Sequence, residues 1–167
     1  MEGTYEKIDG RPAVRFERRL AHPIEAVWRA VTEPDELAAW FPTQVEVDLR
    51  VGGAMRFTFV DHDHPEMRGE VLELDPPRRF AFTWGDDEEV QIELEPADGG
   101  AATLLHFVQL LGAENTAARN AAGWHVCLQR LTTHLAGGDG DAPDWGPIYQ
   151  RYIERGVPSG AEIPGQA

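Results

Sequence analysis

The clearest hydrophobic pattern in the chain is a helical stripe over residues 117–135. Arg119 and Arg130 mostly lie off this stripe, whose apolar residues recur at steps of three and four: Ala117, Ala121, Trp124, Leu128, Leu131 and Leu135. It is the longest helical pattern in the chain, and it follows nearly all of the strand-like segments. Because a sheet with one apolar face must bury that face, we expect this helix to cover it.

Strand-like alternation of apolar and polar residues fills much of the chain before that helix. Seven segments show it or fit between turn signals: residues 14–20, 45–49, 54–60, 67–74, 79–84, 89–95 and 103–111. Short loops join the last six, which favours an antiparallel meander. One of these loops contains Gly52 and Gly53, which we expect to supply the positive φ of a tight hairpin.

Two short helices are expected between the first and second strands. Pro23 begins the first, with Val27 and Val31 on its buried face. The second covers residues 35–40 and ends before Pro42. The order of elements therefore predicts an α+β domain in which a curved seven-stranded antiparallel sheet wraps around the long C-terminal helix.

The chain divides into a main domain and a C-terminal extension. The domain is expected over residues 13–136, and residues 1–12 are polar and expected to be loose. Residues 137–153 read as a Gly- and Asp-rich linker and a short helix that docks on the domain. Residues 154–167 are rich in Gly and Pro, and we expect them to be disordered.

Composition narrows the classes of partner. The chain has 15 Lys and Arg against 29 Asp and Glu, a net charge of −14, so we expect neither nucleic acid nor an anionic membrane as partner. The single cysteine excludes an intrachain disulfide and suits a reducing compartment. No apolar signal-peptide region opens the chain, and no run approaches the ~18 apolar residues of a membrane helix. We expect a cytoplasmic protein.

The run Asp61-His62-Asp63-His64 is the one candidate metal site in the sequence. Imidazole and carboxylate are metal ligands, but no further ligand with a metal-binding spacing is evident. Adjacent residues of a strand also point to opposite faces, so the four cannot all converge. We interpret the run as a polar loop and predict no metal and no cofactor.

The space between sheet and helix is the expected ligand cavity. Its predicted lining is Phe57, Phe59, Trp84, Ile92, Phe107, Gln109, Trp124 and Leu128. Gln109 would be the lone polar group, either orienting a ligand or sitting at the mouth against water or a helix end. His125 is expected to face solvent and Cys127 to be a small buried hydrophobe. No acid, base and nucleophile set is visible, so no catalytic residue is assigned.

Several short motifs together resemble a known family. The chain is similar to the START-like (SRPBCC, helix-grip or Bet v 1-like) superfamily, and within it to the branch named for the C-terminal domain of the activator of Hsp90 ATPase. The matching stretches are Val27-Trp28, Trp40-Phe41-Pro42, Asp48-Leu-Arg-Val-Gly-Gly53, Gly69-Glu-Val-Leu-Glu-Leu-Asp-Pro-Pro77, Phe82-Thr83-Trp84 and Gly123-Trp124 with Leu128 and Leu131.

This resemblance covers residues 13–136 and implies the helix-grip fold, a cavity under the C-terminal helix and no obligatory metal or cofactor. Three functions stay open, because one fold hosts many activities. The favoured one is binding of a small apolar or aromatic molecule. The alternatives are a co-chaperone that activates an Hsp90-type ATPase, which rests on the family name, and a cyclase- or hydrolase-type enzyme using the same cavity. A homodimer is compatible with the sequence.

Overall fold

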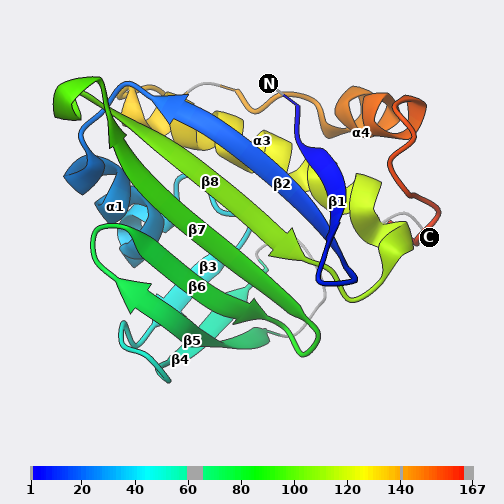
Figure 1. The fold of residues 1–167 in the computed structure, drawn as a ribbon, viewed down its shortest axis with the longest axis horizontal. Helices are drawn as coiled ribbons and strands as arrows, with labels where there is room; N and C mark the ends of the chain where they lie inside the picture. The colour runs from blue at the N-terminus through cyan, green and yellow to red at the C-terminus, as the bar shows by residue number, and fades with distance from the viewer. Residues whose placement is uncertain (1, 60–65, 140, 164–167) are drawn as a thin grey trace.

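The computed structural model describes residues 2–59, 66–139 and 141–163. Its eight strands form one antiparallel sheet in the order β1-β2-β8-β7-β6-β5-β4-β3, curved around the long helix α3 (Figure 1). The strands are β1 (Thr4–Ile8), β2 (Arg11–Leu20), β3 (Gln44–Val47), β4 (Ala54–Thr58), β5 (Met67–Asp75), β6 (Arg79–Trp84), β7 (Glu88–Ala97) and β8 (Ala102–Leu110). The helices are α1 (Ile24–Thr32), α2 (Pro34–Leu37), α3 (Ala117–Leu135) and α4 (Trp145–Glu154), with short 3-10 turns at Asp98–Gly100 and Glu114–Thr116. The α+β helix-grip architecture is confirmed.

The sheet has one strand more than the sequence predicted. Residues 4–8 were expected to be loose, but they form β1 and pair antiparallel with β2, with Thr4 opposite Arg15. Asp9 and Gly10 join the two strands, both at positive φ, which is the geometry of a tight two-residue hairpin. Because β1 is an edge strand with few buried side chains, it lacks the apolar alternation by which the other strands were recognised.

The second short helix is shorter than predicted. It ends at Leu37, whereas the sequence predicted a helix over residues 35–40. The chain from there to Trp40 tightens into turns, with Trp40 N–H donating to the Leu37 carbonyl at 3.1 Å. The Trp40 side chain is fully buried and its Nε1 donates to the Ala30 carbonyl at 2.8 Å. Burial of this indole against α1 therefore outweighs continuation of the helix.

The two glycines between β3 and β4 serve different purposes. Gly52 takes φ 81°, as expected of a hairpin glycine. Gly53 does not have positive φ; a Cβ there would lie 1.8 Å from the Asp48 carbonyl oxygen, so this position needs glycine for space. Strand β3 ends at Val47, two residues earlier than predicted, because residues 48–53 form the connection.

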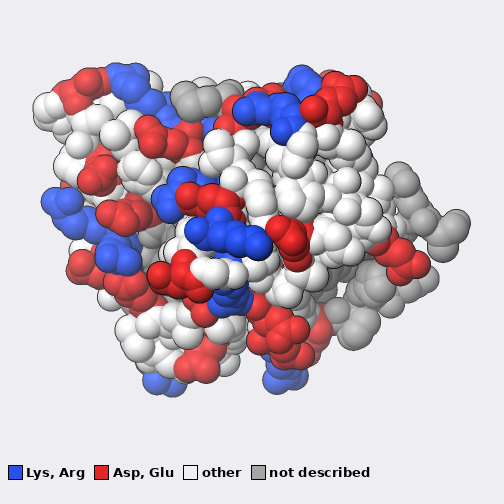
Figure 2. Space-filling view, turned by 45° about the vertical axis from the view of Figure 1, so that its right-hand side comes forward, with Lys and Arg blue, Asp and Glu red and all other residues white. Residues whose placement is uncertain are grey.

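Acidic and basic side chains are interspersed over the surface face drawn in Figure 2. Several face each other across neighbouring strands, such as Arg79 and Glu73 at 3.0 Å and Arg15 and Glu6 at 2.5 Å. Such exposed pairs each add little stability. No helix among the described residues is long and apolar enough to cross a membrane.

Helix α4 packs on α3 and places His125 in a contact that the sequence analysis missed. Ile148 and Tyr152 are the buried residues of α4. The Tyr152 hydroxyl accepts a hydrogen bond from Gly3 N–H at 2.8 Å and lies 3.0 Å from His125 Nδ1. The expectation that His125 faces solvent is therefore wrong. The periodicity of α3 identifies its sheet-facing stripe, but it cannot show that a later helix covers another side.

Partial burial lowers the pKa of His125 below its ordinary value of 6.5. The unfolded chain then takes up a proton at this position at a higher pH than the folded chain does. The contribution of His125 to the free energy of unfolding should be fully present above about pH 6.5. It should fall as the pH drops below that value towards the lowered pKa of the folded state. We expect urea midpoints measured between about pH 8 and about pH 5 to decline less in His125→Gln than in the parent. Parallel curves for the two proteins would contradict this linkage.

The segment after α4 is bound to the start of α3. The Thr116 side chain does not cap α3, and the Ala118 N–H donates instead to the Pro158 carbonyl at 2.9 Å. Ala161 N–H donates to the Asn115 carbonyl at 3.3 Å. Residues 158 and 161 are thus hydrogen-bonded to the start of α3, although they lie in the segment that was expected to be disordered. Helix N-termini need acceptors for their unpaired N–H groups, and Pro158 supplies one. Residues 164–167 lie outside the described part.

Candidate functional site

A pocket of about 270 Å³ opens between the first half of α3 and the region where β6 ends and β7 begins. The residues that line it are Pro42, Phe59, Trp84, Glu88, Arg119, Asn120, Gly123, Trp124 and Cys127. The two indoles are 5.5 Å apart between ring centroids, at an interplanar angle of 61°. The pocket therefore has aromatic walls and a polar end formed by Glu88, Arg119 and Asn120.

The structure separates the eight predicted lining residues into two groups. Phe59, Trp84 and Trp124 line the pocket. The remaining five are buried and belong to the packed interior: Phe57, Ile92, Phe107, Gln109 and Leu128. Ring contacts fill the space beneath α3, with centroids 4.7 Å apart both for Phe57 and Trp84 and for Phe107 and Trp124. The open space is thus at one end of the helix–sheet interface.

Gln109 joins two pocket residues through hydrogen bonds. It lies on the inward face of β8 and is completely buried. Trp124 Nε1 donates to Gln109 Oε1 at 2.7 Å, and Gln109 Nε2 donates to Glu88 Oε2 at 2.8 Å. Gln109 was expected to be a lone polar group; instead it is the middle of a three-residue relay, and Glu88 carries the polar function into the pocket.

Burial raises the pKa of Glu88, while the nearby positive charges of Arg119 and Arg11 act in the opposite direction. The sequence analysis missed Glu88, although a signal existed. Glu88 precedes Val90 by two residues and Ile92 by four, so it shares their inward face. The predicted strand began one residue too late to include it.

Arg119 was also missed, because it lies off the buried stripe of α3. It precedes Gly123 by four residues, so the two are neighbours on one side of the helix, and both line the pocket. Its guanidinium donates to the Glu162 carbonyl of the C-terminal segment. A basic side chain therefore belongs to a site whose predicted lining had Gln109 as its lone polar group.

Cys127 lines the pocket as a buried thiol. It is buried, as predicted, and burial raises the pKa of its thiol to about 12. The thiolate is the nucleophilic form of cysteine, and such a pKa leaves almost none at neutral pH. Among the described residues that line the pocket, Glu88 carries the one carboxyl group, and Arg119 stays protonated.

A metal site is not evident in the part of the chain that the structure describes, where no group of three His, Cys, Asp or Glu residues could hold an ion. The run with His62 and His64 lies outside the described residues, so the predicted absence of a metal there stays a prediction. Elemental analysis of the purified protein checks it. A stoichiometric transition metal that is lost on changing both histidines to alanine would contradict the prediction.

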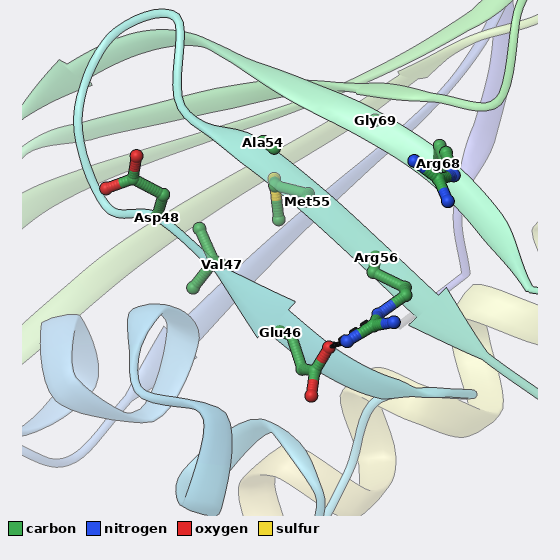
Figure 3. Close-up of a pocket in the computed structure, with 8 residues that line it drawn as sticks. All are labelled: Glu46, Val47, Asp48, Ala54, Met55, Arg56, Arg68 and Gly69. Carbon is green, nitrogen blue, oxygen red and sulfur yellow. Dashed lines mark hydrogen bonds and ion pairs between the residues drawn. The ribbon is translucent and has the colours of Figure 1, made fainter.

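A second hollow, of about 390 Å³, lies on β3, β4 and β5, at the β3 edge of the sheet. Figure 3 shows Glu46 and Arg56 pointing toward each other from neighbouring strands. Arg68 and Asp48 also line it, and both are exposed. Solvated charges surround this hollow, so it suits an apolar ligand less well than the pocket beside Trp84 and Trp124.

Comparisons with known proteins place this geometry in context. The family model described as "Activator of Hsp90 ATPase homolog 1-like protein" matches residues 21–136. No curated protein sequence matches the chain.

Solved structures share the fold. A conserved protein of unknown function from Enterococcus faecalis superposes with a TM-score of 0.77 and 26% identity, over 92% of this chain and 89% of the other. CalU16 from Micromonospora echinospora gives a TM-score of 0.73 and 26% identity, over 92% and 94%. DynU16, a protein of the dynemicin biosynthetic locus, gives 0.62 and 27%, over 87% of this chain and 48% of DynU16.

Proposed function

The chain belongs to the activator of Hsp90 ATPase homolog 1-like family, and we propose that it binds a small, flat and largely apolar molecule in the pocket beside Trp84 and Trp124. The observation that carries the proposal is an open space walled by two indoles, beside a region where aromatic side chains are in ring contact. Ligand sites are typically concave and mostly apolar, with a few placed polar groups. A volume of about 270 Å³ suits a ligand of two or three fused rings rather than a long lipid.

Gly123 supports a binding role for this pocket. It lies in the middle of the 19-residue helix α3, where glycine costs about 0.8–1 kcal/mol relative to alanine. A Cβ added at Gly123 would meet no atom within 4 Å, so packing does not require glycine at this position. A side chain here would project into the pocket that Gly123 lines, and its absence keeps the space open.

Binding without catalysis fits the side chains that line the pocket. Acid–base catalysis uses positioned groups that give up and take up protons near the working pH. Within the part of the lining that the structure describes, Glu88 carries the one carboxyl group, and the Cys127 thiol has a pKa of about 12. The cyclase- or hydrolase-type alternative would need a second such group, which the described lining residues do not supply.

Tryptophan emission tests the proposal. A flat apolar probe such as 2-naphthol should give a saturable change in emission, because it would lie against Trp84 and Trp124. The change should shrink in Trp124→Phe and remain in Trp145→Phe, since Trp145 stacks on Tyr149 in α4, with ring centroids 4.6 Å apart. The proposal fails if the parent gives no saturable change, or if Trp145→Phe alone abolishes it.

A chaperone role is the second candidate, favoured by the name of the matching family. It predicts that the purified protein raises the ATPase rate of an Hsp90-type chaperone in a concentration-dependent way. An unchanged rate at saturating protein would exclude this role. The binding proposal does not depend on the result, because it rests on the pocket.

A further inference from the structure

The hydrogen-bond relay behind the pocket has a fixed direction. The Trp124 indole N–H can only donate, so the Gln109 side chain must present Oε1 to it. The amide nitrogen of Gln109 then faces Glu88 and donates to Oε2. Glu88 is thereby held as an acceptor through Oε2, which leaves Oε1 as the carboxylate oxygen that can serve a ligand.

The polar end of the pocket offers a ligand an acceptor more readily than a donor. In its ionised form, which burial opposes and the positive charges of Arg119 and Arg11 favour, the Glu88 carboxylate has no proton to donate. Arg119 donates to the Glu162 carbonyl and Asn120 Nδ2 donates to the Thr116 carbonyl, so part of the donor capacity beside Glu88 is already used. A negatively charged ligand group would also meet the charge of Glu88. These contacts favour a ligand whose polar group donates a hydrogen bond.

We propose that Glu88 selects ligands that carry a hydrogen-bond donor, such as a phenolic hydroxyl or a ring N–H, at the edge of an apolar ring system. The inference rests on the proposed function, and it names the ligand class for the same pocket. The rings lie against Trp84 and Trp124 on the side that lines the pocket, and the donor meets the Glu88 carboxylate. Gln109 is a positioning residue, because it orients both Glu88 and Trp124 and does not itself line the pocket.

Matched probes test this selection by calorimetry. 2-Naphthol carries a donor, and 2-methoxynaphthalene has the same rings without one. Because hydrogen bonds to charged groups are among the stronger ones, we expect the parent to bind 2-naphthol about 10- to 100-fold more tightly. In Glu88→Gln the amide oxygen can still accept from Gln109 while the NH₂ group faces the pocket. The variant should therefore bind 2-naphthol and 2-methoxynaphthalene about equally tightly.

Asp86→Asn is the matched control. It removes the same charge two residues away, at an exposed position that does not line the pocket, and it should keep the preference of the parent. Equal binding of both probes by the parent would overturn the inference and leave the proposed function standing. A preference that persists in Glu88→Gln would assign the selection to another group and also overturn it. Absence of binding by either probe would overturn both proposals.

Discussion

Leu131→Ala is expected to lower the free energy of unfolding by about 2–5 kcal/mol. Leu131 lies in the second half of α3 and is 1% exposed, within the single core that the helix forms with the sheet. Removing its side-chain carbons loses their burial and leaves a cavity that close-packed neighbours cannot fully refill. Urea unfolding followed by circular dichroism measures the change.

Leu135→Ala is the control for this substitution. It removes the same atoms from the last residue of the same helix, where the side chain is partly buried. Its cost should be clearly smaller than that of Leu131→Ala. Midpoints within error of the parent for Leu131→Ala would show that α3 does not close the core as described.

Gly123→Leu is expected to weaken probe binding by more than about 100-fold and to leave the fold at least as stable. The new side chain would occupy the pocket that Gly123 lines, so a ligand and the leucine would compete for one space. Leucine favours a helix over glycine by roughly 0.8 kcal/mol, so the free energy of unfolding should stay level or rise. Titration with 2-naphthol and urea unfolding of the same preparation measure both quantities.

This opposite response separates pocket blocking from unfolding. Gln129→Leu is the control, because it adds the same side chain at an exposed position of α3 outside the pocket, and it should bind as the parent does. A Gly123→Leu protein that binds the probe with unchanged affinity would place the ligand elsewhere.

The sequence predicted most of the fold, because the apolar periodicities are strong where elements are half buried. The bounds of α3 and β6 agree with the expected ranges 117–135 and 79–84. Strand β1 was missed since an edge strand needs no apolar face. The hydrogen bonds of the C-terminal segment were missed because the Pro158 carbonyl accepts from Ala118 N–H at the start of α3, a contact that depends on tertiary position.

The candidate site was harder to predict, for a physical reason. Alternation identifies which side chains point inward, and it correctly placed Trp84 and Gln109 there. It cannot tell which inward side chains pack against each other and which leave a space, since that depends on the curvature of the sheet and the position of α3. Phe57 and Phe107 therefore belong to the core, while Arg119 reaches the pocket from outside the apolar stripe.

The most direct test of ligand binding at this site is a nitrogen–proton correlation spectrum of the five tryptophan indole N–H groups during titration with 2-naphthol. The account predicts that the signals of Trp84 and Trp124 shift together and saturate. The signal of Trp40, whose indole is buried against the Ala30 carbonyl, and that of Trp145 on α4 should stay in place. Saturable shifts confined to Trp145, or no shift at Trp84 and Trp124, would contradict it.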